Sequence, residues 1–212
     1  MQGDKLVIKD HHIRAARQVA EIILPEIHQA KERYAITIAG ESGSGKSETA
    51  ESLRQELEKQ GIQSFVFQQD DYFHYPPKSN SKMREKDINR VGTSEVKLEL
   101  LDQNLKDAIE GKNIIQKPLV YFEEDRIDSE TVNLEGYKAV IAEGTYTTAL
   151  ENVHKRIFIA RNYFDTKETR AERSREKQDE FLEKILRIEH EIILKQSEKA
   201  DLIITKEYQL KT

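Results

Sequence analysis

One run of eight residues constrains this chain more than any other part of its sequence. It reads Gly40-Glu41-Ser42-Gly43-Ser44-Gly45-Lys46-Ser47. The run matches the pattern G-x-x-x-x-G-K-[ST] at every defined position. The residues before it, 34–39, are rich in β-branched side chains and predict a buried strand, and a helical pattern begins at about Lys46. A strand, a glycine-rich turn and a helix in this order are typical of a loop that holds phosphate groups.

The chemistry of phosphate binding explains each residue type in this loop. Backbone N–H groups must approach triphosphate oxygens, so glycines are needed where a side chain would block them or where φ is positive. The helix that follows supplies free N–H groups and the positive end of its dipole. Lys46 is placed to reach the β- and γ-phosphates of ATP, and the Ser47 hydroxyl to coordinate Mg²⁺. We therefore predict that residues 40–47, with Thr49, bind ATP and Mg²⁺.

Short apolar runs alternate with helical patterns along the rest of the chain. The further strands predicted by such runs are 65–67, 119–122, 139–142, 157–159 and 202–204. The helices predicted by periodicity are 10–31, 46–60, 94–110 and a long stretch between the last two strands. This alternation produces βαβ units. The predicted class is α/β, a three-layer P-loop NTPase fold with a doubly wound, mainly parallel sheet and helices on both faces.

We expect one domain over residues 1–212, because this length suits a single large α/β unit. It would comprise a helical N-terminal extension (1–33), an irregular, polar acceptor-side loop (72–93) and a lid region (165–182). Pro25 should bend or end the first helix. The long C-terminal helical stretch carries Ile185, Ile188 and Ile192, which serve either the core or the seam of a homo-oligomer.

Composition excludes several classes of protein. There is no cysteine, which rules out disulfides and thiolate metal sites. The net charge of −5 argues against nucleic-acid binding, which usually needs a basic surface. No stretch approaches the ~18 apolar residues of a membrane span. We expect a cytoplasmic protein that binds neither nucleic acid nor membrane.

Acidic residues follow two of the predicted strands. Because ligands of an open parallel sheet lie beyond the carboxyl ends of its strands, these acids are candidates for the site. Asp70 and Asp71 follow residues 65–67, and Glu143 follows residues 139–142. Asp70 is a candidate base toward an acceptor hydroxyl and a candidate metal ligand, although a turn aspartate is an equal interpretation of its position alone. Glu143 is favoured as a metal-holding acid.

Arginines lie on the helical stretch after Asp165. Arg170 and Arg173 are three residues apart and so share a helix face, with Arg175 close by. A lid over ATP would use such side chains to neutralise charge on the transferring phosphoryl group. The alternative is a solvated face on which the nearby Glu168, Glu172 and Glu176 pair with the arginines.

The sequence resembles the uridine kinase/phosphoribulokinase family of P-loop kinases over about residues 34–205. The matching segments are Ile36-Thr37-Ile38-Ala39-Gly40 running into Gly45-Lys46-Ser47, Gln69-Asp70-Asp71-Tyr72-Phe73, Pro118-Leu119-Val120-Tyr121, Val140-Ile141-Ala142-Glu143-Gly144-Thr145-Tyr146, Thr169-Arg170-Ala171-Glu172-Arg173 and Ala200-Asp201-Leu202-Ile203-Ile204. The phosphate loop is common to many families. The Asp-Asp-Tyr-Phe and Glu-Gly-Thr-Tyr segments are what narrow the choice to this one.

The resemblance implies an ATP-dependent kinase that transfers the γ-phosphoryl group to a hydroxyl of a small molecule. The catalytic residues it implies are Asp70 as base, with Lys46, Arg170 and Arg173 on the phosphates. The metal ligands it implies are Ser47, Asp70 and Glu143. The residues it places near the acceptor are Asp71, Tyr72, Phe73, Tyr121 and Arg126.

The acceptor-side segments depart from those of uridine-acting members. Those members tend to carry an Asn-Phe-Asp-His-Pro-like segment where this chain has residues 88–94, and a Tyr-Asp-Phe…His-Ser-Arg pattern where it has residues 121–126. The acceptor therefore stays open between a nucleoside, a sugar phosphate and another small alcohol. Two further alternatives are a nucleotide-dependent ATPase or switch, and an interaction protein without transfer chemistry. The last is disfavoured because Lys46, Asp70 and Glu143 occur together.

Overall fold

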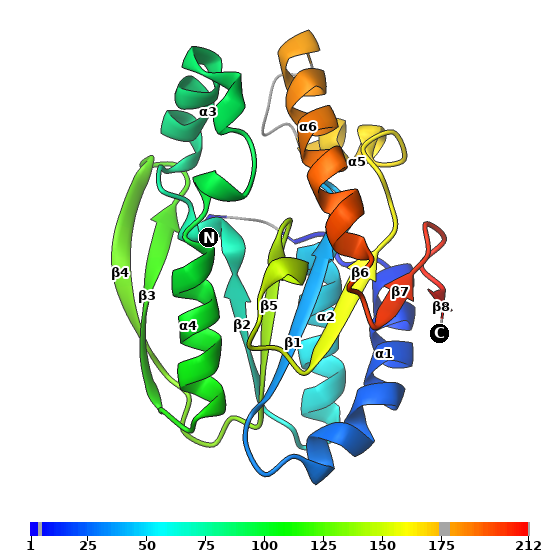
Figure 1. Cartoon of the computed structure of the whole chain (residues 1–212). Helices are drawn as coiled ribbons and strands as arrows, with labels where there is room; N and C mark the ends of the chain where they lie inside the picture. The colour runs from blue at the N-terminus through cyan, green and yellow to red at the C-terminus, as the bar shows by residue number, and fades with distance from the viewer. Residues whose placement is uncertain (4–5, 174–178, 212) are drawn as a thin grey trace.

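A six-stranded sheet forms the centre of the computed structural model, which describes residues 1–3, 6–173 and 179–211 (Figure 1). Its strands, in spatial order, are β2 (Ser64–Gln68), β5 (Ala139–Gly144), β1 (Tyr34–Gly40), β6 (Lys155–Ile159), β7 (Leu202–Ile204) and β8 (Leu210–Lys211). All neighbours are parallel except β7 and β8. Every residue of β1 is buried, as expected for the central strand of a sheet covered on both faces.

Two layers of helices enclose this sheet. On one face, α1 (Asp10–Gln29) and α2 (Lys46–Lys59) pack against Ile36 and Ile38 of β1. On the other face, α4 (Leu98–Ile109) and part of α6 (Glu180–Ser197) pack against Ala35 and Ala39. Alternate residues of one strand thus enter two separate hydrophobic cores, and the predicted three-layer α/β architecture is confirmed.

A two-stranded antiparallel arm lies beside α4, apart from the main sheet (Figure 1). It consists of β3 (Ile114–Tyr121) and β4 (Arg126–Asn133), with Lys117 opposite Glu130. The predicted strand at 119–122 is therefore the end of a longer one, and it belongs to this arm. Sequence reasoning missed β4 because only Val132 of this strand is buried, so it lacks the apolar run by which buried strands are recognised.

The structure corrects several predicted boundaries. The acceptor-side segment 72–93 is not irregular throughout, because it contains α3 (Pro77–Lys86), which begins with proline at its first position. The buried residues of α3 are Asn80 and Arg84, so it shows no apolar stripe in the sequence. The helix predicted from residue 94 starts later, at Leu98, after a 3₁₀ turn at Thr93–Glu95.

The first and the last predicted helical regions also differ from the observed helices. The first helix continues through Pro25 and ends at Gln29. The long C-terminal stretch contains two helices, α5 (Lys167–Arg173) and α6. Ile185 of α6 is buried and Ile192 packs against the core. Among the helices of the described ranges, none combines the length and apolarity that crossing a bilayer requires.

Candidate active site

The phosphate loop joins the end of β1 to the start of α2, and its glycines are required by geometry. Gly43 and Gly45 have φ of 75° and 87°, values that side-chain-bearing residues rarely adopt. A Cβ on Gly43 would lie 2.9 Å from Cγ of Arg170, and a Cβ on Gly45 would lie 2.5 Å from Oη of Tyr208. Both the backbone conformation and the close packing around the loop therefore exclude other residues.

The outer side of this loop is held by residues from the C-terminal part of the chain. The hydroxyl of Tyr208 donates to the carbonyl oxygen of Ser44 at 2.8 Å. Glu41 accepts from the backbone N–H of Tyr163 at 2.6 Å, and its other carboxylate oxygen lies 2.6 Å from Nδ1 of His190 on α6. Although Glu41 lies in the phosphate loop, its side chain connects the loop to Tyr163 and His190, which flank the lid region on either side.

The hydroxyl groups of the loop and of the first turn of α2 differ in burial and in hydrogen bonding. Ser42 is half-buried. The buried hydroxyls of Ser44 and Thr49 have no hydrogen-bond partner among the described residues. Buried polar groups normally find a partner, so these two hydroxyls are candidates for contact with a bound ligand.

Lys46, Ser47 and Glu143 lie together at the C-terminal ends of β1 and β5. Nζ of Lys46 donates to the carbonyl oxygen of Glu41 at 3.0 Å, and no described carboxylate forms an ion pair with it. The Ser47 hydroxyl donates to Oε1 of Glu143 at 3.1 Å. Burial raises the pKa of Glu143 to about 7, and the nearby carboxylate of Asp70 contributes to this rise, whereas Lys46 and the Ser47 hydroxyl oppose it.

These groups fit a magnesium ion. A hydroxyl and carboxylates are the oxygen ligands that Mg²⁺ prefers, and a cation would relieve the repulsion between Glu143 and Asp70. Within the described part of the chain, no group of three or more His, Asp or Glu side chains could hold a metal on its own. An ion bound by Ser47, Asp70 and Glu143 would take its other ligands from water and phosphate oxygens.

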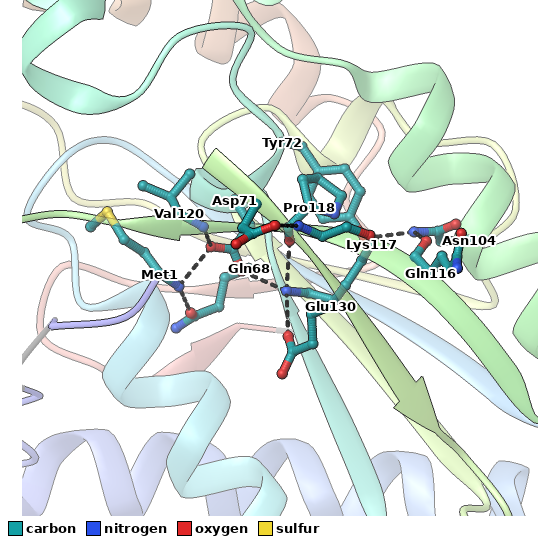
Figure 2. Close-up of polar contacts among 12 residues, drawn as sticks. Met1, Gln68, Asp71, Tyr72, Asn104, Gln116, Lys117, Pro118, Val120 and Glu130 are labelled. Atoms are coloured by element: carbon teal, nitrogen blue, oxygen red, sulfur yellow. Dashed lines mark hydrogen bonds and ion pairs between the residues drawn. The ribbon is translucent and has the colours of Figure 1, made fainter. Parts of the chain in front are cut away.

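The two adjacent aspartates after β2 have opposite environments. Both lie in the 3₁₀ turn η1 (Gln69–Tyr72). Asp70 is half-buried, and its carboxylate has no hydrogen bond or ion pair with any described residue. Asp71 is 2 % exposed and accepts from Nζ of Lys117 at 2.8 Å and from the backbone N–H of Val120 at 3.0 Å (Figure 2). The amino group of Met1 also lies 3.1 Å from Asp71.

This difference separates their chemistry. The carboxylate of Asp70 is available to accept a proton, whereas both oxygens of Asp71 are engaged by β3 and the N-terminal residue. We predicted Asp71 as an acceptor contact, but its side chain points into the junction between η1 and the arm (Figure 2).

The other residues predicted near the acceptor do not form one group. Tyr72 is fully buried, and its hydroxyl accepts from Nδ2 of Asn104 at 2.8 Å (Figure 2). Phe73 is half-buried beside Val96. Tyr121 and Arg126 lie at the turn of the arm, with the guanidinium 4.2 Å from the centre of the ring. Tyr72 therefore belongs to the core and the last two to the tip of the arm.

Of the predicted lid arginines, the structure describes the side chain of Arg170. Arg170 on α5 is 8 % exposed, donates to the carbonyl oxygen of Tyr163 at 2.7 Å and also bonds the hydroxyl of Thr166. Its side chain packs over Gly43, so the structure brings it to the phosphate loop. The side chain of Arg173 and the whole of Arg175 lie outside the described residues.

Sequence reasoning missed the role of Gln69. This residue is fully buried, and its side-chain oxygen accepts from the backbone N–H of Tyr146 at 2.7 Å. A Cβ on Gly144 would lie 2.2 Å from Cβ of Gln69, so glycine is required there for the two strand ends to meet. The signal was present, because Gln69 opens one matching segment and Gly144 and Tyr146 lie in another.

A buried ion-pair cluster was also missed. Arg84 of α3 donates to both oxygens of Glu95 at 2.7 and 2.8 Å and to Glu189 of α6 at 3.0 Å. The residue after Glu189 is His190, which meets the phosphate loop at Glu41. Helix α6 therefore contacts both the acceptor-side helix and the nucleotide-side loop. No local sequence pattern predicts such ion pairs, because their members are far apart in the sequence.

Comparison with known proteins agrees with this geometry. The model of the phosphoribulokinase/uridine kinase family matches residues 35–167, which include the phosphate loop, both aspartates and Glu143. The chain belongs to this family. As a member, this domain is a P-loop kinase, an ATP-dependent phosphotransferase that acts on an alcohol group of a small molecule. The resemblance inferred from the sequence is confirmed.

One curated relative extends the comparison. The bifunctional alpha-galactosidase/sucrose kinase AgaSK of Mediterraneibacter gnavus is 27 % identical over 192 residues, which are 84 % of this chain and 20 % of that protein. This chain thus spans about a fifth of the length of that relative.

Two solved structures share the fold of this kinase. A provisionally assigned fructose transport system kinase of Silicibacter sp. TM1040 has a TM-score of 0.65 and 17 % identity, covering 89 % of this chain and 98 % of that one. The phosphoribulokinase of Rhodobacter spheroides has a TM-score of 0.62 and 14 % identity, covering 82 % of this chain and 70 % of that one. The predicted P-loop kinase fold is therefore confirmed.

Proposed function

We propose that this kinase uses ATP·Mg²⁺ to phosphorylate a hydroxyl of a small polyol, with sugars as the acceptor class. The observation that carries the proposal is the free carboxylate of Asp70 at the end of β2, electrostatically coupled to Glu143, which the Ser47 hydroxyl contacts. A carboxylate without an internal partner, next to a phosphate loop, is suited to receive the proton of an acceptor hydroxyl.

The reaction would be an in-line transfer. The acceptor oxygen attacks the γ-phosphorus of ATP, the bond from that phosphorus to the bridging oxygen of ADP breaks, and the hydroxyl proton passes to Asp70. Lys46 and Arg170 would stabilise charge on the phosphoryl oxygens. Mg²⁺, held by Ser47, Asp70 and Glu143, would neutralise phosphate charge when bound. The protein's contribution is then positioning and electrostatics.

Three observations favour a sugar over the other acceptor classes. The relative whose name includes a sucrose kinase is 27 % identical over most of this chain. A phosphorylated acceptor would favour extra cations such as Lys82, Arg84, Lys86 or Arg90, and of these Arg84 is buried and already paired with Glu95 and Glu189. Residues 88–94 and 121–126 also lack the segments typical of uridine-acting members.

The test is ADP release from ATP·Mg²⁺ with a panel of neutral sugars, sugar phosphates, nucleosides and small alcohols. We expect stimulation by neutral sugars that is lost in Asp70→Asn. The matched control is Asp107→Asn on the surface of α4, which should leave the rate unchanged. Stimulation by nucleosides alone would contradict the acceptor class. Release that no acceptor stimulates would favour an ATPase or switch.

A further inference from the structure

A buried ion pair connects the arm to the turn that carries the candidate base. Lys117 of β3 and Asp71 of η1 are 4 % and 2 % exposed. All three protons of the Lys117 ammonium have acceptors: Asp71 at 2.8 Å, the carbonyl oxygen of Pro118 at 2.9 Å and Glu130 of β4 at 3.1 Å (Figure 2). With its hydrogen bonds complete, Lys117 has no donor left for a substrate.

The turn η1 is anchored at every position except one. Gln69 bonds the backbone of Tyr146, Asp71 bonds the arm, and the hydroxyl of Tyr72 bonds Asn104. Only Asp70 lacks a described partner. Three anchors on a four-residue turn leave little freedom for the direction in which the remaining carboxylate points.

We propose that Lys117 is a positioning residue for phosphoryl transfer: by holding Asp71, it fixes the turn η1 and so aims Asp70 at the acceptor hydroxyl. The inference rests on the proposed function, in which Asp70 is the base. It assigns Asp71 to the same positioning role, in place of the acceptor contact predicted from the sequence.

The physical argument concerns what a buried ion pair is suited to do. Removing two charges from water costs free energy that their attraction only partly returns, so an apolar pair can stabilise a fold equally well. What an ion pair adds is direction, because charged hydrogen bonds are short and geometrically demanding. Here that direction is applied at the residue next to Asp70, and it comes from a strand 46 positions away in the sequence.

The arm and the base are therefore linked mechanically. β3 supplies both the Lys117 ammonium and the Val120 N–H that hold Asp71. Glu130 contributes from β4, but its side chain is 42 % exposed, so water can replace much of its contact with Lys117. The critical connection is thus the inner pair between Lys117 and Asp71.

The test compares Lys117→Met in two backgrounds. In the otherwise unchanged kinase we expect kcat to fall about 10²-fold, the effect of a misplacement near 1 Å, with the KM for ATP nearly unchanged. In an Asp70→Asn background the same substitution should add almost nothing to the loss, because Lys117 acts through Asp70. An equal loss in both backgrounds, or an unchanged kcat in the first, would overturn the proposal.

Two controls separate positioning from folding. Lys112→Met removes an exposed lysine that pairs with Asp107 at 2.6 Å, and should leave kcat unchanged. The double variant Asp71→Asn/Lys117→Met removes both charges of the inner pair, and the Met1 amino group keeps its hydrogen bond to Gln68. We expect it to melt near the wild-type temperature and still show low kcat. Recovery of kcat together with thermal stability would mean that the pair serves stability alone.

The wild-type assay distinguishes this inference from the proposed function. If no acceptor on the panel stimulates ADP release by the wild-type protein, the proposed function fails and this inference fails with it. If the wild type is active and Lys117→Met is equally active, only the positioning role of Lys117 is wrong.

Discussion

The phosphate loop and the β3–β4 arm belong to the proposed site and are built by different kinds of contact. The loop consists of eight consecutive residues whose glycines and backbone N–H groups would bind the phosphates. The arm acts through side chains that meet residues far away, such as Lys117 with Asp71 across 46 positions. On the same side of the site, Arg84 meets Glu189 across 105 positions.

This difference explains why the two regions carry different information. A site formed by backbone groups requires glycine at fixed positions, so it can be recognised as a motif in the sequence. A site that side chains build from distant elements needs only complementary partners, and these leave no pattern in one sequence. The nucleotide region can accordingly be recognised from one sequence, whereas the contacts of the acceptor region become visible only in the structure.

The largest expected effect separates nucleotide binding from transfer. Lys46→Ala should weaken ATP binding and lower turnover by roughly 10³-fold, because a charged donor to the phosphates is lost. Asp70→Asn should lower kcat by about 10²–10⁴-fold while ATP affinity stays near the wild-type value. Calorimetric titration with ATP and steady-state kinetics would check both. If Asp70→Asn lost ATP binding as well, the division between the two regions would be wrong.

Stability should depend strongly on the ion-pair cluster of the acceptor region. Arg84→Met removes the cation that pairs with two buried carboxylates, Glu95 and Glu189, which should cost about 3–5 kcal/mol of unfolding free energy. Arg54 is a matched control on α2, since it also pairs with two glutamates but is 32 % exposed. Arg54→Met should cost about 1 kcal/mol or less. Urea unfolding would measure both, and equal losses would contradict the argument.

A single added methyl group at Gly144 should disturb the junction between the two regions. In Gly144→Ala the new Cβ would lie 2.2 Å from Cβ of Gln69, so the ends of β2 and β5 must separate. We expect kcat to fall about 10²-fold because Asp70 and Glu143 lose their alignment. Unfolding free energy should also fall by about 1–3 kcal/mol, the usual range for overpacking. A variant with unchanged kcat would show that the alignment tolerates this shift.

The smallest expected effect is a loss of folding stability at acid pH, caused by a buried histidine next to the phosphate loop. His12 of α1 is buried close to Gly45, and burial, helped by His11, lowers its pKa to about 4. The unfolded chain binds the proton at a higher pH, so this contribution to stability is present above about pH 6.5 and is lost as the pH falls toward 4.

Between pH 7 and pH 5 the loss from His12 should be about 2 kcal/mol of unfolding free energy. Urea unfolding at both pH values should therefore show a smaller loss for His12→Gln than for the wild type. His28→Gln, which changes an exposed histidine at the other end of the same helix, is the control and should behave as the wild type. Identical pH slopes for all three proteins would contradict the prediction.

The sequence by itself determined the nucleotide region and the fold class. Residues 40–47 predict both the loop and its ligand because each residue type answers a local demand of backbone or phosphate. The strands of the main sheet are apolar runs, since both faces of the sheet are covered, and only the two-residue β8 escaped prediction. The positions of Asp70 and Glu143 followed, because acids after parallel strands gather at one edge.

Only the tertiary structure decided which of the two aspartates is free and which is held. Asp70 and Asp71 have the same chemistry and adjacent positions, so no local rule separates them. Lys117 and Val120 of the arm engage Asp71, and the hydroxyl of Tyr72 turns toward Asn104 in the core. The physical reason is that a side chain's role depends on its partners, and here those partners come from strands and helices tens of residues away.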